Sequence, residues 1–156
     1  MFDAQDREMP PLNDWLRGRH ALTGVAPEWN LDALPAEPTI LFREWILRAD
    51  ADGVPEPHTA TLATVDTAGV PDARTLILKG IDAGGWAFAS TRSSRKGEQL
   101  AASPAAAQAG VAPGDWVRWR VVPARIEFWQ GSRDRRHTRV VYESVGDGWR
   151  HSIARD

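Results

Sequence analysis

The sequence has no cysteine among its 156 residues, which excludes disulfide bonds, thiolate metal sites and a cysteine nucleophile. It also has no apolar run near the ~20 residues that a membrane-spanning helix requires. Its first residues, MFDAQDREMPPL, are acidic and lack the basic start and apolar core of a signal peptide. A net charge of −2 gives no general reason to expect nucleic-acid binding. We therefore expect a cytoplasmic protein that binds neither membranes nor nucleic acids.

The motifs of several common enzyme classes are missing as well. The sequence contains neither G-x-G-x-x-G nor G-x-x-x-x-G-K-[ST], so it has no Rossmann or Walker phosphate loop. It has no H-E-x-x-H zinc motif and no G-x-S-x-G nucleophile elbow. His20, His58 and His151 have no partners at metal-ligand spacing, so we expect no metal site.

The composition of the chain predicts one domain preceded by an N-terminal arm. The chain is 42% hydrophobic and 26% charged, which is ordinary for a globular protein, and its length suits one domain with a real core. Residues 1–35 are rich in Pro, Asp and Asn, and we predict an N-terminal arm there with one short helix around 13–19. Residues 36–156 form the predicted domain, in which the Ala/Pro/Gly-rich segment 101–115 is a short linker.

Apolar periodicity predicts helices and short strands within that domain. Leu41, Phe42 and Trp45 recur on one face of a helix predicted over 39–49, with Thr39 as its N-cap. A second helix is predicted over 94–102, after Ser93 or Ser94 as the cap. The rest alternates with the period of strands and lacks crossover helices, so we predict a mainly β (α+β) fold with antiparallel sheets. The predicted strands are 58–65, 74–79, 86–90, 116–122, 124–130, 139–143 and 149–153, with turns at 66–72, 80–85 and 146–148.

Eight tryptophans are many for a chain of this length. Those within predicted strands are Trp86, Trp116, Trp119, Trp129 and Trp149. Because large flat side chains fill a small barrel or a dimer interface, we expect most of them in the core.

The segment 124–142, ARIEFWQGSRDRRHTRVVY, carries the densest positive charge. Arg133, Arg135, Arg136, His137 and Arg139 lie within seven positions, beside a single acid. Guanidinium groups stay charged and match the oxygens of phosphate or carboxylate in pairs. The cluster therefore favours an anionic ligand, and the alternative is a solvated basic loop between two strands.

A second candidate anion site lies at the start of the helix predicted over 94–102. A helix N-terminus presents free N–H groups and a partial positive charge. Arg95 and Lys96 in its first turn are unfavourably placed unless an anion binds there. This arrangement indicates a phosphate site, and the alternative is a surface helix with two solvated cations.

Several motifs together resemble one family. The run IEFWQG, then RRH, then Arg two residues later, and the order LATVD, glycine turn, R-x-x-x-x-K, aromatic strand and S-R-K-G-x-x-L are similar to those of the pyridoxamine 5′-phosphate oxidases. The resemblance implies a homodimeric FMN-binding split β-barrel with flanking helices, a flavoprotein of vitamin B6 metabolism. It also implies an oxidoreductase that converts the 4′ amine or alcohol of pyridoxamine or pyridoxine 5′-phosphate to the aldehyde, with O2 as acceptor.

The same resemblance implies roles for particular residues. The expected cofactor-binding residues are Arg74, Thr75, Leu76, Ile77, Leu78, Lys79, Ala89, Ser90, Arg95, Lys96, Trp129 and Arg139. The expected substrate-binding residues are Lys79, Arg135, Arg136 and His137. Of these, Arg135 and His137 are the expected catalytic residues, which orient and polarise the substrate ring. The flavin site is expected to combine the Arg74 strand and Lys96 of one subunit with Trp129 and Arg139 of the other.

The sequence departs from the family pattern in three places. Arg136 replaces a leucine, Thr138 an acid and Ala89 an aromatic residue. The family's middle segment, with further barrel strands and contacts to FMN and to the substrate phosphate, has no counterpart between the helix at 94–102 and the strand at 116–122. Two alternatives therefore stay open, a non-catalytic descendant that binds flavin or pyridoxal phosphate, and a split-barrel reductase using another flavin or deazaflavin.

Overall fold

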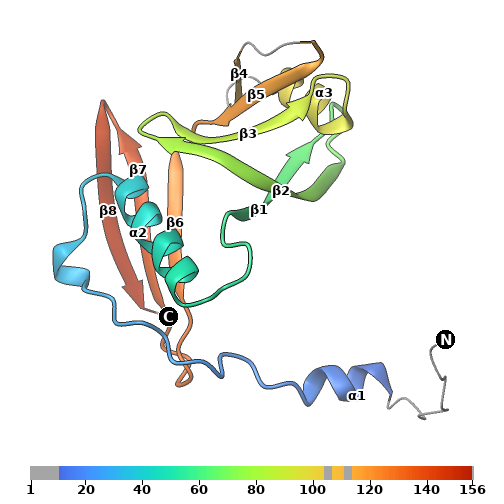
Figure 1. The fold of residues 1–156 in the computed structure, drawn as a ribbon. Coiled ribbons are helices and arrows are strands. Elements are labelled where there is room, and N and C mark those ends of the chain that lie inside the picture. The colour runs from blue at the N-terminus through green and yellow to red at the C-terminus, as the bar shows by residue number, and fades with distance from the viewer. Residues whose placement is uncertain (1–10, 104–106, 111–113, 156) are drawn as a thin grey trace.

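A computed structural model describes residues 11–103, 107–110 and 114–155, and its strands form two antiparallel sheets (Figure 1). The larger sheet has five strands in the order β1-β2-β3-β5-β4, and the smaller has three in the order β6-β7-β8. The strands are β1 Thr59–Val65, β2 Pro71–Asp82, β3 Gly85–Thr91, β4 Ala107–Gly110, β5 Trp116–Val121, β6 Arg125–Gln130, β7 Thr138–Val145 and β8 Gly148–Arg155. Every strand pair is antiparallel, which confirms the predicted fold class.

The helices are α1 Leu12–Arg17, the 3-10 turn η1 Leu31–Ala33, α2 Pro38–Ala51 and α3 Arg95–Ala102. Helix α2 begins one residue earlier than predicted because Pro38 occupies its first turn, where a missing N–H costs nothing. Glu37 stands at the N-cap position without a side-chain cap bond, so the assignment of Thr39 as N-cap was wrong. The helix ends before Gly53, whose φ of 76° stops it as expected. None of the described helices is long and apolar enough to cross a membrane.

Each sheet has its own hydrophobic core. Phe88, Leu100, Val117 and Trp119 are buried between α3 and the five-stranded sheet. In the second core α2 covers the three-stranded sheet, as Figure 1 shows. That core consists of Leu41, Phe128, Val140 and Tyr142, with Trp45 packed against it.

Helix α2 also ties the two sheets together. Trp45 meets Phe128 of β6 with ring centroids 5.3 Å apart, and Phe42 on the same helix meets Trp86 of β3, also at 5.3 Å. Both pairs are edge-to-face, the geometry that aromatic rings favour. One amphipathic helix therefore fixes how the two sheets sit relative to each other.

Strand β2 is longer than the sequence suggested. Gly80 and Ile81 pair with Ala87 and Trp86, so the turn predicted at 80–85 was wrong and the chain reverses only at 83–84. The pairing shifts between Leu78 and Gly80, which leaves Lys79 in a β-bulge. An extra residue of this kind breaks the alternation on which the strand prediction depended.

The segment predicted as a linker contains a strand. Within 101–115, α3 continues to Ala102 and β4 pairs with β5 along its length. Residues 104–106 and 111–113 of that segment lie outside the described residues. The boundaries of arm and domain stay a prediction.

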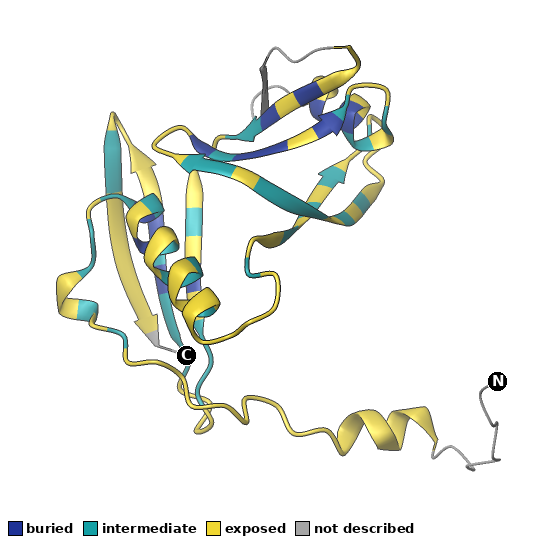
Figure 2. Ribbon diagram, in the orientation of Figure 1, coloured by how far each residue is buried: buried dark blue, intermediate teal, exposed yellow. Residues whose placement is uncertain are grey.

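The arm carries the short helix that was expected around 13–19. Helix α1 has no buried residue, and Figure 2 shows its surface exposed. The arm rejoins the body where Gln130 Nε2 donates to the Pro27 carbonyl at 2.9 Å and Tyr142 donates its hydroxyl to the Pro35 carbonyl at 2.8 Å.

The burial of the tryptophans depends on which face of the strand they lie on. Trp119 is buried, whereas Trp116, three positions earlier on β5, is 57% exposed and Trp129 is 44% exposed. Trp86 and Trp149 are half-buried. The expectation of a core position was therefore wrong for Trp116, because the strand period places it on the outer face.

Candidate functional site

Arg74 on β2 is held in a network that the sequence did not reveal. Its Nη1 donates to Thr64 Oγ1 at 2.5 Å and to the Leu62 carbonyl at 3.3 Å. Its Nη2 donates to Gln99 Oε1 at 3.2 Å and lies 2.6 Å from Asp72 Oδ2. With a side chain only 20% exposed, this guanidinium is fixed in place between β1 and α3.

Arg95 in the first turn of α3 shares an acid with Arg74. Its Nε lies 3.1 Å from the same Asp72 Oδ2, and its Nη2 lies 3.9 Å from Asp66 Oδ2. Asp66 is itself fixed by the β1–β2 turn, because its Oδ1 accepts the backbone N–H groups of Ala68 and Val70. Two guanidiniums, those of Arg74 and Arg95, therefore converge on Asp72 near the start of α3.

The start of α3 is built tightly against the end of β3. Ser94 caps the helix by accepting the N–H of Gly97 at 3.2 Å, and its hydroxyl donates to the Thr91 carbonyl at 2.7 Å. Buried Ser90 lies 3.1 Å from the Ser94 hydroxyl. A Cβ at position 97 would lie 2.5 Å from the carbonyl oxygens of Thr91 and Arg92, so only glycine allows this approach. The cap is thus Ser94, one of the two residues predicted for this position. Lys96, in the first turn of the helix, is half-buried.

The other residues predicted to bind the cofactor on this sheet have different environments. Leu76 packs against the core of the five-stranded sheet, so its side chain serves the fold. Thr75 and Lys79 are exposed on β2, and Ile77 and Leu78 are half-buried. Ala89 is exposed on β3, opposite Arg118 of β5. The structure thus joins Arg74 and Arg95 through Asp72, while Lys79 lies five residues further along β2.

A second group of predicted residues surrounds the β6–β7 loop. The N–H of Ser132 donates to His137 Nδ1 at 3.0 Å, which leaves the hydrogen of the neutral ring on Nε2. The His137 ring lies 5.0 Å from the Trp129 ring, centroid to centroid. Arg135 has a φ of 62° and closes a turn by donating its N–H to the Ser132 carbonyl at 3.1 Å. A non-glycine residue in this conformation is strained, and such residues gather at functional sites.

The cations of this loop are not equally available to a ligand. Arg136 binds Asp134 through Nε at 2.7 Å. Asp134 also accepts the hydroxyl of Ser132, and these bonds hold the pKa of its carboxyl well below the usual range. Arg133 donates to the carbonyls of Leu22 and Thr23 in the arm.

Arg135 and Arg139 complete the group. Within the described part of the chain the side chain of Arg135 makes no ion pair. Arg139 on β7 lies 3.5 Å from Glu127 Oε1 on the neighbouring strand β6. Arg135 is therefore the loop cation best placed to meet a ligand.

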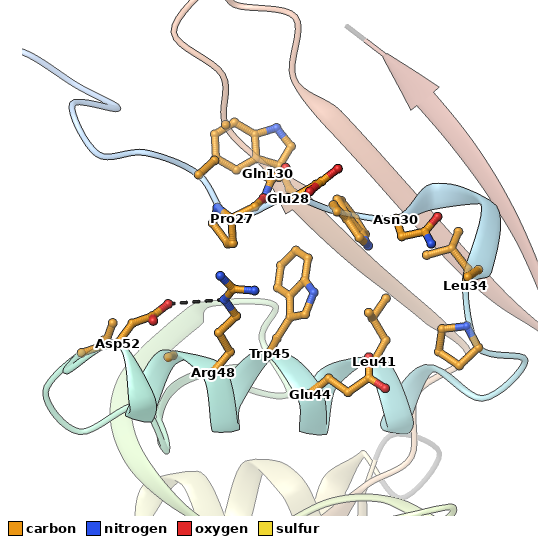
Figure 3. Close-up of a pocket in the computed structure, with 18 residues that line it drawn as sticks. Pro27, Glu28, Asn30, Leu34, Leu41, Glu44, Trp45, Arg48, Asp52 and Gln130 are labelled. Carbon is orange, nitrogen blue, oxygen red and sulfur yellow. Dashed lines mark hydrogen bonds and ion pairs between the residues drawn. The ribbon is translucent and has the colours of Figure 1, made fainter.

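Two hollows lie beside this loop, against the arm. A cavity of about 560 Å³ is lined by residues from the segment 26–35, from α2 and from the end of β6 (Figure 3). Trp29, Trp45 and Trp129 line it, with Glu44 and the Arg48–Asp52 ion pair at 3.5 Å. A more open groove of about 650 Å³ extends along residues 22–26 and 130–138. Of the predicted site residues, only Trp129 lines the first hollow and only Arg136 the second.

The two groups of predicted residues lie apart within one chain. The Arg74–Arg95 pair belongs to the five-stranded sheet and α3, while Trp129 and Arg139 belong to the three-stranded sheet and His137 to its β6–β7 loop. Figure 1 shows α3 and the β6–β7 loop at different ends of the molecule. A single chain therefore does not assemble the complete predicted site.

Residues 116–153 match the family model described as "Pyridoxine 5'-phosphate oxidase C-terminal dimerisation region". A pyridoxine/pyridoxamine 5′-phosphate oxidase from Ectopseudomonas mendocina is 30% identical over 186 residues, covering 74% of this chain and 86% of the relative. The chain belongs to this family. The relative from Rhodospirillum rubrum is 55% identical over 40 residues, a match that spans 26% of this chain and only 20% of that relative.

Two solved structures share the fold. PhzG from Burkholderia lata 383, in complex with tetrahydrophenazine-1-carboxylic acid, superposes with a TM-score of 0.69 at 24% identity and covers 80% of this chain and 95% of that chain. A pyridoxamine 5′-phosphate oxidase-related, FMN binding protein from Nostoc punctiforme has a TM-score of 0.60 at 13% identity, covering 78% and 98%. These likenesses confirm the FMN-binding split barrel as the fold.

Three residues of the Arg74 network were missed in the sequence. Thr64 lies opposite Asp72 in the β1–β2 register, so the hairpin itself could have indicated their proximity. Gln99 is buried on α3, 25 residues from Arg74. Nothing in the sequence around Gln99 indicates that it is buried, so its contact with Arg74 could not be predicted.

Proposed function

We propose that this protein is an FMN-dependent oxidoreductase that acts as a pyridoxamine or pyridoxine 5′-phosphate oxidase. The observation that supports it most is the convergence of Arg74 and Arg95 beside the N-terminus of α3, within a chain of this family. Such a site suits the phosphate of FMN, because fixed guanidiniums and helix N–H groups both bind anions.

The chemistry of the donors agrees with a flavin phosphate. Arg74, Arg95 and Lys96 are cationic, and Ser90 and Ser94 add hydroxyls beside them. Gln99 contributes a further sign, since its Nε2 is buried without a hydrogen-bond partner in the described structure. An unpaired buried donor next to an anion site is costly unless a ligand satisfies it. The residues present therefore fit the phosphate end of FMN.

When bound, FMN supplies the hydride acceptor, so the chain mainly has to hold and orient the substrate. We assign this task to Arg135 and His137. In its neutral form His137 donates from Nε2, because Ser132 occupies Nδ1, and it can polarise an oxygen or nitrogen on the substrate ring. Arg135 offers a fixed charge on a turn whose backbone conformation is locked.

The substrate phosphate needs cations of its own. We assign Lys79, in the bulge of β2, and Arg136, on the β6–β7 loop, to this role. Overall, the amine would lose two electrons and two protons to become an imine, which water hydrolyses to the aldehyde and ammonia. Molecular oxygen would take up the two electrons and two protons and become hydrogen peroxide.

We further propose a homodimer in which each flavin site takes residues from both chains. Arg74, Lys79 and Lys96 would come from one chain, and Trp129 and Arg139 from its partner. The separation of the two groups within one chain supports this, as does the match of residues 116–153 to a dimerisation region. The exposed indoles of Trp116 and Trp129 provide apolar surface that such an interface would cover.

The activity is tested on purified protein supplied with FMN. Visible flavin bands that persist after desalting show binding, and peroxide formed on adding pyridoxamine 5′-phosphate in air shows turnover. Flavin retention without peroxide would favour the non-catalytic alternative. Absence of flavin retention would contradict the proposal.

A second candidate is the oxidation of an aromatic carboxylate without phosphate. The missing middle segment, which the resemblance credits with substrate-phosphate contacts, favours it, and Arg135 could hold a carboxylate as well as a phosphate. The solved PhzG complex holds a tricyclic carboxylic acid. Oxygen consumption with tetrahydrophenazine-1-carboxylic acid, but not with pyridoxamine 5′-phosphate, would select this second candidate.

A further inference from the structure

Asp72 occupies the space between the two guanidiniums to which we assign the flavin phosphate. Its Oδ2 lies 2.6 Å from Arg74 Nη2 and 3.1 Å from Arg95 Nε. One carboxylate oxygen therefore serves both cations. In this structure the anion that satisfies the pair belongs to the protein itself.

Arg74 has almost no donor left for another anion. Of the five N–H donors of a guanidinium, the four on its terminal nitrogens face Thr64, the Leu62 carbonyl, Gln99 and Asp72. A phosphate can bind these nitrogens only by replacing one of the four acceptors.

The acceptors differ in how readily they can be replaced. Gln99 is only 5% exposed and accepts a further hydrogen bond of 2.5 Å from Thr64. These two acceptors are therefore held in place and are hard to displace from Arg74. The Leu62 carbonyl belongs to a β-strand. Asp72 is 31% exposed, and its released carboxylate can be hydrated. It is also the only charged one, so its exchange for a phosphate keeps both guanidiniums neutralised.

We propose that Asp72 is an internal counter-anion that a phosphate monoester must displace. Asp72 therefore lowers the affinity for FMN and leaves the affinity for riboflavin, which has no phosphate, unchanged. The inference rests on the proposed assignment of the FMN phosphate to Arg74 and Arg95. Asp72 is then a specificity-determining residue, because the competition is felt by FMN and not by riboflavin.

The test is a pair of fluorescence titrations of flavin-free protein, one with FMN and one with riboflavin. Asp72→Asn should bind FMN about three- to tenfold more tightly, as expected for removing a partly exposed charge competitor, with unchanged affinity for riboflavin. Asp72→Ala should also raise the ratio of the affinity for FMN to the affinity for riboflavin. Asp82→Asn is the matched control, since it removes the same charge from the same strand but from a carboxylate paired with Arg120. Its FMN to riboflavin ratio should equal that of the wild type.

Two results would count against the inference in different ways. Equal affinity of the wild type for FMN and riboflavin would contradict the phosphate site itself, and with it the proposed function. A wild-type preference for FMN that both Asp72 variants leave unchanged or reduce would overturn the counter-anion role alone. In that case Asp72 would be a residue that positions the two arginines.

Discussion

Single residues in the β6–β7 loop determine the geometry of the proposed substrate site. Arg135 accepts a φ of 62°, a conformation that costs about 1 kcal/mol or more for a side chain with a Cβ. The turn bond to Ser132 and the Ser132 contact to His137 hold it there. The loop therefore presents Arg135 and His137 from one rigid turn.

We expect Arg135→Gly to lower turnover with pyridoxamine 5′-phosphate by about 100-fold or more, in the range typical of a removed polarising group. Glycine relieves the backbone strain, so the loss would reflect the side chain. Flavin content should stay at the wild-type level, because the residue is assigned to the substrate. Steady-state kinetics and flavin spectra of the same preparation test this. A parallel loss of flavin would move Arg135 to the cofactor.

Tyr142 connects the arm to the core. Its side chain is fully buried, and its hydroxyl bonds to the Pro35 carbonyl. Burial, with the nearby Glu44, raises the pKa of this phenol. The neutral phenol is thus favoured in the folded state, so this stabilisation is complete below the ordinary pKa of about 10 and falls as the pH rises towards the folded value.

We expect Tyr142→Phe to lower the free energy of unfolding at neutral pH by about 1 kcal/mol, the usual net value of one hydrogen bond. The variant should also lose stability less steeply than the wild type above about pH 10. Urea unfolding at neutral and alkaline pH measures both effects. Parallel pH profiles for the two proteins would show that Tyr142 does not titrate within the fold.

At the scale of elements, α3 is the part that positions the proposed anion site. Its start is fixed by the Ser94 cap and by the close approach of Gly97 to the end of β3. Both features depend on backbone contacts, so a small change there should move the helix as a unit.

We expect Gly97→Ala to destabilise the protein by about 1–3 kcal/mol, as overpacking does, and to weaken FMN binding. The added methyl group meets backbone carbonyls, which cannot move aside. Glu98→Ala, at an exposed position of the same helical turn, is the control and should have little effect. Thermal unfolding and FMN titration of both variants test this. Wild-type behaviour of Gly97→Ala would mean that α3 is not packed as the structure shows.

Apart from the N-cap of α2, the sequence predicted the elements that local signals define. The Ser94 cap, the Gly53 stop and the turn at Gly146 each depend on neighbouring residues, and all three are present. Prediction failed where a distant contact decides, as in the continuation of β2 past Lys79 or the strand β4 inside the predicted linker. For the site, Arg95 and Lys96 in the first turn of a predicted helix indicated an anion, whereas Arg74 was suggested only by the family resemblance. The Asp72 and Gln99 contacts required the hairpin register and the burial of α3.

At the scale of the whole molecule, the two halves of the predicted site are carried by different sheets. Each sheet has its own core, and α2 sets their separation. A second copy is the simplest source of the missing half, and binding of FMN and dimerisation should then stabilise each other.

We therefore expect the protein to sediment as a dimer that becomes more resistant to dilution when FMN is present. Sedimentation velocity across a dilution series, with and without FMN, measures this. Riboflavin, which lacks the phosphate, serves as the control ligand and should protect the dimer less. A monomer that holds one FMN tightly would refute the shared site.

The most direct test of the account is anaerobic addition of pyridoxamine 5′-phosphate to the FMN-loaded protein, with the flavin absorbance followed in time. We predict that the visible bands bleach as the bound flavin is reduced, and that air restores them with formation of hydrogen peroxide. The Arg135→Gly variant should hold the same flavin and bleach much more slowly. Flavin bands that stay unchanged on adding the substrate to the wild type would contradict the proposed oxidase function.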